Sequence, residues 1–251
     1  MQYKNAIIEF FSGDYSILAQ TALQRTGVLK EACLRQTGKQ VLPSQVTKWF
    51  QDGNIEPLTA FLKTNQPITS IFIDLLIERL EKEAEQILNS IPQTPKCIAS
   101  IGCGSGILEG IISLKCELKH LLLIDIEKSA THDHGFSLNP SGYATLKKAK
   151  ELCKNIYNLQ DIKTINPSRQ TLENHGEEFD LMLSLLSMGF HYPTSLYTDY
   201  VINSTKKGGI VIFDLKHLAK DAGMSRLFQA FSLKTVIPRH PISSRIVLQK
   251  N

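Results

Sequence analysis

The stretch Cys97-Ile98-Ala99-Ser100-Ile101-Gly102-Cys103-Gly104-Ser105-Gly106-Ile107-Leu108-Glu109-Gly110 decides the fold of this chain. It opens with an apolar run, continues with glycine at three alternating positions, and ends in residues that can begin a helix. Glycine allows a positive φ and lets another group approach the backbone with no Cβ in the way. The stretch therefore predicts a buried strand, a tight loop and a helix in direct succession.

A second apolar run, residues 121–124, follows after a gap of helix length and ends on Asp125. Strand, glycine loop, helix, strand and acid is the order that holds a nucleoside against the end of a parallel sheet. The acid can accept hydrogen bonds from both ribose hydroxyls, as it does in dinucleotide-binding folds. The two runs together predict a nucleoside site in which Asp125 contacts the ribose.

Residues 100–106 resemble the first motif of the Rossmann-like S-adenosylmethionine-dependent methyltransferases, an acidic or small residue, an apolar residue and then G-x-G-x-G. The dinucleotide fingerprint G-x-G-x-x-G fits less well, because Ile107 stands where its third glycine belongs. The resemblance covers roughly residues 95–251 and implies S-adenosylmethionine as the cofactor and S-adenosylhomocysteine as the product. The cofactor contacts that we expect are Ile101, Gly102, Cys103, Gly104, Ser105, Gly106, Asp125, Ile126, Asn166 and Ser187.

Composition agrees with a soluble enzyme. The chain has 251 residues, is 42% hydrophobic and carries a formal charge of +4, which permits an anionic substrate but gives no dedicated nucleic-acid surface. No apolar run approaches the ~20 residues that span a bilayer, and residues 1–13 lack the features of a signal peptide. The five cysteines include no C-x-x-C pair, so we expect reduced thiols in a cytoplasmic protein. The sequence does not decide between a monomer and a homodimer.

The pattern changes near residues 92–96. Residues 1–92 read as a helical N-terminal region, a substrate lid or a dimerisation region, and residues 93–251 as the S-adenosylmethionine-binding domain. The clearest helix is 71–88, whose apolar positions recur at helical spacing, with Thr69 and Ser70 as candidate N-caps. Shorter helices are predicted over 15–26, 28–35, 44–51 and 56–63.

Strands and helices alternate after residue 95. We predict strands at 97–101, 120–124, 163–166, 181–185, 209–214, 235–238 and 245–249. We predict helices at 106–114, 141–157, 193–203 and 224–231. This succession indicates an α/β fold, and the resemblance implies a Rossmann-like, doubly wound, mostly parallel sheet of seven strands. The short separation of the last two strands predicts a C-terminal β-hairpin, with the final strand antiparallel.

Ligands of an open α/β sheet bind at the carboxyl ends of its strands, which directs attention to the residues after the fourth strand. That segment lacks the Pro-Pro-aromatic motif with which amide-N and base methyltransferases hold a planar amine. It offers His191, which we predict to be the catalytic base, because an alcohol attacks a methyl sulfonium well only as its proton is removed. The alternative is a loop histidine without a catalytic role. Tyr192 is expected to contact substrate or to pack.

Two further pairs of residues are candidate substrate contacts. His132 and His134 lie on the loop that leaves the second strand, and a metal site there is not expected, because adjacent residues rarely face one metal ion. Asp214 and Lys216 alternate onto one face at the end of the fifth strand, where they could orient a substrate or pair with each other. Segments 134–136 and 189–191 together resemble a pattern of some small-molecule and sugar O-methyltransferases.

These observations predict an S-adenosylmethionine-dependent methyltransferase that transfers its methyl group in line to oxygen of a small polar acceptor. Two alternatives stay open: a non-catalytic protein that binds the nucleoside, and an NAD-dependent oxidoreductase. The sequence contains no phosphate-binding G-x-x-x-x-G-K-[ST] loop, no G-x-S-x-G elbow and no H-E-x-x-H helix, so kinase, hydrolase and metalloprotease functions lack support.

Overall fold

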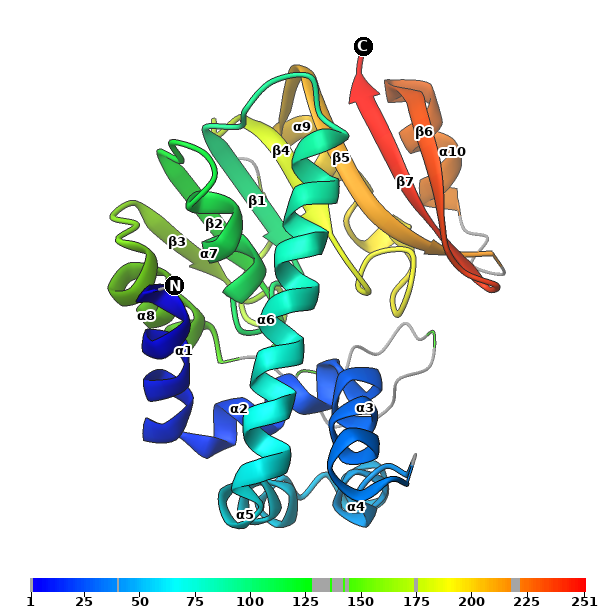
Figure 1. The fold of residues 1–251 in the computed structure, drawn as a ribbon. Coiled ribbons are helices and arrows are strands. Elements are labelled where there is room, and N and C mark those ends of the chain that lie inside the picture. Colours follow the sequence, from blue (N-terminus) through cyan, green and yellow to red (C-terminus); the bar gives the residue numbers. More distant parts are fainter. Residues whose placement is uncertain are drawn as a thin grey trace.

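The computed structural model describes residues 2–39, 41–127, 136, 142, 145–173, 176–217 and 222–251. The chain opens with a series of helices, packed below and in front of the sheet in Figure 1. They are α1 (Gln2–Gly13), α2 (Tyr15–Gln24), α3 (Thr26–Thr37), α4 (Ser44–Asp52), α5 (Glu56–Thr64) and α6 (Gln66–Asn89). Gly38 and Gly53 adopt the left-handed conformation that ends α3 and α4.

The long helix α6 begins earlier than the sequence pattern predicts. Its N-cap is Asn65, and Pro67 stands in its first turn, where a fixed φ and a missing N–H suit a helix start. The predicted caps Thr69 and Ser70 are therefore wrong. Thr69 is buried inside the helix, and its hydroxyl donates a hydrogen bond of 2.6 Å to the carbonyl of Leu62.

Within the described residues the sheet has seven strands in the order β3-β2-β1-β4-β5-β7-β6. They are β1 (Cys97–Ile101), β2 (His120–Ile124), β3 (Ile162–Ile165), β4 (Phe179–Ser184), β5 (Thr205–Lys216), β6 (Phe231–His240) and β7 (Ser243–Lys250). Strands β1 to β5 pair in parallel, and β7 runs antiparallel to both β5 and β6. The predicted fold class and its C-terminal hairpin are confirmed.

Alternate residues of the central strands face two different layers of helices. Ile98, Leu121 and Leu181 share one core with α6, α7 (Ile107–Ser113) and α8 (Leu146–Tyr157). Ala99, Leu122 and Met182 share the other core with α9 (Thr198–Ser204) and α10 (Ala222–Ala230). The buried residues of α1 to α6 belong to the first of these cores, so the helical N-terminal region packs together with one face of the sheet (Figure 1).

Several predicted boundaries shift. The helix predicted over 141–157 begins at Leu146, and the one predicted over 193–203 divides into a 3₁₀ turn, η1 (Thr194–Leu196), and α9. Strand β5 is longer than the predicted 209–214, because its pairing with β7 continues to Lys216. The hairpin between β6 and β7 turns at residues 241–242 alone, since cross-strand pairing extends to Ser243.

Candidate functional site

The glycine loop between β1 and α7 has the conformation that its sequence predicts. Gly102, Gly104 and Gly106 have φ values of 76°, 58° and 75°, a region that side-chain-bearing residues rarely adopt. The N–H of Gly102 donates to the carbonyl of Ile124 at 2.7 Å, which fastens the loop to the end of β2. The loop therefore lies at the carboxyl edge of the sheet, next to the predicted acid.

Two of these glycines also make close approaches to other segments. A Cβ on Gly102 would lie 2.4 Å from Cβ of Ser187, which follows β4. A Cβ on Gly104 would lie 2.4 Å from Oε1 of Gln24, at the end of α2. The loop is thus closed in by the post-β4 segment on one side and by the N-terminal helices on the other.

Asp125 faces the same loop. Its carboxylate accepts hydrogen bonds of 2.7 Å from the backbone N–H groups of Gly104 and Ile126. Burial raises the pKa of Asp125 to about 6, although those two hydrogen bonds act to lower it. The carboxylate is therefore at the loop that the sequence predicts and can be ionised at neutral pH.

A second acid near the loop, Glu109, was not identified from the sequence pattern. Ser100 holds the position where the methyltransferase motif allows an acid, and its hydroxyl donates to Oε1 of Glu109 from α7. Glu109 is 3% exposed, and its Oε2 is buried without a hydrogen-bond partner among the described residues. Burial raises the pKa of Glu109 to about 7. The carboxyl group at this point of the motif comes from the helix and is partly protonated at neutral pH.

Cys103, inside the loop, is 8% exposed. Burial raises the pKa of its thiol well above the ordinary value, and the nearby Asp125 and Glu109 raise it further. The cysteines of the described chain form no disulfide, and Cys33, Cys103 and Cys153 are buried.

The segment after β4 is folded tightly onto the glycine loop. Ser184 donates its hydroxyl to the carbonyl of Ile101 at 3.1 Å and accepts from the N–H of Met188 at 2.8 Å. The carbonyl of Ser187 accepts from the N–H groups of Phe190, His191 and Tyr192. This turn brings the side chains of residues 190–192 to the same edge of the sheet as Asp125.

A cavity of about 750 Å³ lies at this edge, within the ~300–1,000 Å³ range of ligand pockets. It brings together many of the predicted site residues, which are Gly102, Cys103, Ser105, Asp125, Ser187, His191 and Tyr192. It is also lined by N-terminal residues that sequence reasoning did not single out, among them Gln24 and Arg25.

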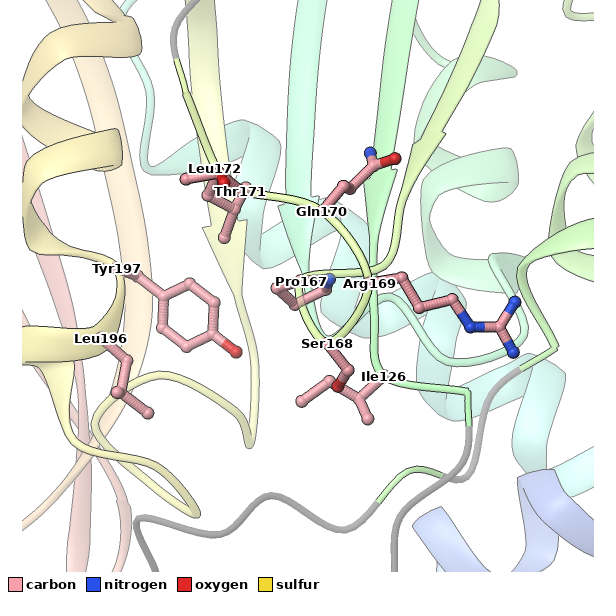
Figure 2. Close-up of a pocket in the computed structure, with 9 residues that line it drawn as sticks. All are labelled: Ile126, Pro167, Ser168, Arg169, Gln170, Thr171, Leu172, Leu196 and Tyr197. Atoms are coloured by element: carbon pink, nitrogen blue, oxygen red, sulfur yellow. The ribbon is translucent and has the colours of Figure 1, made fainter.

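A neighbouring cavity of about 640 Å³ is lined by residues that follow β2 and β3 and by Leu196 and Tyr197 at the end of η1. Figure 2 shows the ring of Tyr197 on one side of it and the loop of Pro167 and Ser168 on the other. Predicted residue Ile126 lines this cavity, and Asp125 lines the larger one, so the two spaces adjoin at consecutive residues. Asn166 lies beside it, buried, with its side-chain oxygen accepting from the N–H of Ser168 at 3.0 Å.

One alternative from the sequence was that Asp214 and Lys216 pair with each other, and in the structure they do not. Asp214 is 3% exposed and forms a two-point ion pair with Arg245 of β7, at 2.8 and 3.0 Å. Nζ of Lys216 lies 5.0 Å from the ring centroid of Phe190. His132 and His134 lie outside the described residues. Within the described part of the chain, no three His, Cys, Asp or Glu side chains come together as a metal site.

The remaining predicted contacts, Ile101 and Gly106, lie at the two ends of the loop, where β1 ends and α7 begins. Ile101 is 1% exposed at the end of β1. A Cβ on Gly106 would lie 3.2 Å from Sγ of Cys153 in α8, so this glycine allows the loop to pack against that helix.

None of the helices that the structure describes is long and apolar enough to cross a membrane.

Comparison with solved structures finds the same fold in other chains. The PH0226 protein of Pyrococcus horikoshii OT3 is similar with a TM-score of 0.50 and 13% identity, over 69% of this chain and 90% of that one. The chain has the fold that the resemblance implies. No family model matches the sequence, and no curated protein does.

Two further similar structures carry names that describe methyl transfer. The N-methyltransferase NodS of Bradyrhizobium japonicum WM9, solved with S-adenosylhomocysteine, is 13% identical over 69% of this chain and 87% of that one, with a TM-score of 0.48. The ribosomal protein L11 methylase of Lactobacillus delbrueckii subsp. bulgaricus is 17% identical over 70% and 79%, with a TM-score of 0.46.

Proposed function

We propose that this protein is an S-adenosylmethionine-dependent methyltransferase that methylates oxygen of a small polar acceptor. The observation that carries the proposal is the contact between Asp125 and the N–H of Gly104, at the meeting point of two ligand-sized cavities. A carboxylate beside three glycines of positive φ suits a nucleoside that lies against the backbone.

The described residues fit the cofactor. A Cβ on Gly102 or Gly104 would collide with Ser187 or Gln24, so glycine at these positions lets the two segments close around the loop as a cradle. Asp125 would accept from the ribose hydroxyls, and the cavity between Ile126 and Tyr197 would receive the adenine. The larger cavity would hold the methionine end together with the acceptor. When bound, S-adenosylmethionine supplies an electrophilic methyl group on its sulfonium.

His191 is the candidate base on the acceptor side. It lines the larger cavity with Tyr192, and its ring packs edge-on against Phe190 at a centroid distance of 4.9 Å. The hydrogen bond from its backbone N–H to the carbonyl of Ser187, 2.9 Å long, fixes where the residue sits. The imidazole would remove the proton of an acceptor hydroxyl as the oxygen attacks, and a base is needed more for oxygen than for an amine. Holding the reactants in one enclosed space would supply much of the rate.

Calorimetry tests the cofactor assignment. We expect S-adenosylmethionine and S-adenosylhomocysteine to bind the full chain and NAD to give no heat. Asp125→Ala should weaken both by about tenfold or more, because a charge-assisted hydrogen bond is lost. Asp161→Ala, at an exposed position before β3, is the matched control and should bind as the wild type does. Binding of NAD without binding of S-adenosylhomocysteine would overturn the proposal.

A further inference from the structure

A cluster of charged side chains lies beside the larger cavity, beyond the glycine loop. Its members are Arg25 at the α2–α3 junction, Glu83 in α6, Asp214 in β5, Arg239 in β6 and Arg245 in β7. Three guanidinium groups meet two carboxylates, so the cluster has an excess of one positive charge when all five groups are ionised.

One arginine of the cluster is matched by its own acid. Nε and Nη2 of Arg245 donate to the two carboxylate oxygens of Asp214, and their side chains are only 2% and 5% exposed. This buried, two-point pair neutralises Arg245. The remaining carboxylate, Glu83, is therefore left to balance Arg25 and Arg239.

Glu83 is shared among all three arginines. Its Oε1 accepts from Nη2 of Arg239 at 2.9 Å and from Nη2 of Arg245 at 2.8 Å, and its Oε2 lies 3.5 Å from Nη2 of Arg25. Burial acts to raise the pKa of Glu83, but the three guanidinium groups hold it below the ordinary value. Each guanidinium has five N–H donors, so one carboxylate cannot satisfy them. Nη1 of Arg245 is in fact buried with no partner in the part of the chain that the structure describes.

Arg25 and Arg239 are the two arginines of the cluster that reach the cavity. Both line it, with side chains 26% and 32% exposed, and Phe190 and His191 line the same cavity. The first turn of α3, at Thr26 and Gly27, lines the same space, and no side chain caps that end of the helix. The positive end of the α3 dipole therefore adds to the charge of the two guanidinium groups.

We propose that Arg25 and Arg239 bind an oxyanion, a carboxylate or a phosphate group, of the methyl acceptor. The inference rests on the proposed function and adds the chemical class of its substrate. Glu83 and Gln86 orient Arg239, whose Nη1 donates to Oε1 of Gln86 at 2.8 Å. The guanidinium fork matches both oxyanions, and anchoring one end of the acceptor would leave its hydroxyl on the His191 side of the cavity.

The test uses the full chain saturated with S-adenosylhomocysteine, into which benzoate and phenyl phosphate are titrated by calorimetry. We expect at least one of the two anions to bind, and to bind about tenfold more weakly to Arg239→Gln and to Arg25→Gln. Arg239→Lys should keep part of the affinity, because it keeps the charge but loses the fork. The matched control is Arg226→Gln, an exposed arginine of α10 that pairs with Asp199, and it should bind as the wild type does.

The outcomes distinguish a failure of this inference from a failure of the proposed function. If S-adenosylhomocysteine binds and neither anion does, the oxyanion site is wrong and the cofactor site stands. If an anion binds only to the free protein and competes with S-adenosylhomocysteine, the arginines serve the cofactor's own carboxylate, and the inference is also wrong. If S-adenosylhomocysteine does not bind, both fail together. If circular dichroism shows that Arg25→Gln does not fold, the variants of the partly exposed Arg239 and the wild-type titrations decide.

Discussion

Oδ2 of Asp125 accepts a 2.7 Å hydrogen bond from the backbone N–H of Gly104, twenty-one residues earlier in the chain. The bond joins the end of β2 to the loop that leaves β1, and it exists in the free protein. A bound ribose would therefore meet a carboxylate that is already oriented. A side chain that is oriented before binding reduces the conformational entropy that the protein loses on association.

Binding of S-adenosylhomocysteine should depend on the ionisation of Asp125. The pKa of this carboxyl is about 6 in the free protein, so below pH 6 it becomes protonated and loses acceptor capacity. We expect the affinity to fall toward tenfold per pH unit between pH 6 and pH 5. Calorimetry on Asp125→Asn should give weaker binding without this pH dependence. An identical pH profile in that variant would assign the titration to another group.

Gly102→Ala should both lower stability and weaken cofactor binding. Its φ of 76° costs a side chain about 1–2 kcal/mol, and the new Cβ would lie 2.4 Å from Cβ of Ser187. Gly208→Ala is a matched control, because Gly208 has the same φ of 76° and open space around it. Urea unfolding should show a loss in both variants, whereas calorimetry should show weakened S-adenosylhomocysteine binding only for Gly102→Ala. Equal binding by both variants would contradict the cradle.

Glu109 should make the free energy of unfolding fall as the pH rises. Its folded pKa of about 7 exceeds its ordinary value of 4.5, so its contribution is full below pH 4.5 and is lost as the pH rises through 7. Asp125, with a pKa of about 6, acts in the same direction, but its share is the same in the wild type and in Glu109→Gln and cancels when the two are compared from pH 6 to pH 8. Over that range the wild type should lose about 1.4 kcal/mol relative to Glu109→Gln.

Urea unfolding at pH 6 and pH 8 measures that difference. Glu85→Gln serves as the control, because Glu85 is exposed and pairs with Lys115 at the surface. It should follow the wild type at both pH values. A Glu109→Gln profile that parallels the wild type would show that Glu109 does not carry the titration.

His191→Asn should lower turnover by about 100-fold or more once an acceptor is found, since general base catalysis typically contributes that much. The affinity for S-adenosylhomocysteine should stay within about twofold, because the proposed role concerns the acceptor. His120→Asn is the control, at the start of β2, where the ring pairs with Asp161 at 2.8 Å. Turnover within twofold of the wild type under saturating acceptor would remove His191 from the mechanism.

The sequence predicted the sheet and the cofactor-facing loop because both depend on local patterns. Apolar runs at 97–101 and 120–124 form buried strands, and the three alternating glycines stand at the positions where the loop adopts a positive φ, which other residues rarely do. Asp125 follows its strand directly, so its place at the carboxyl edge follows from the strand. The start of α6 was missed because Thr69 resembles a cap in sequence, whereas Pro67 determines the first turn.

The charge cluster could not be predicted, because its members are far apart in the chain. Arg25, Glu83 and Arg239 meet only when α6 crosses the sheet and the β6–β7 hairpin returns beside it. The spacing of Asp214 and Lys216 predicts that they share one face of their strand. No local pattern predicts Arg245 as the partner of Asp214. An isolated basic residue at a helix junction, as at Arg25, is too common a feature to indicate a site.

The buried thiol of Cys103 makes the glycine loop measurable without any ligand. A thiol with a raised pKa is mostly protonated and reacts slowly with alkylating reagents while the loop keeps its shape. Its rate of labelling, compared with that of the partly exposed Cys116, therefore records how often the loop opens. Cys103, between the first two glycines, therefore reports on local unfolding at the cofactor site.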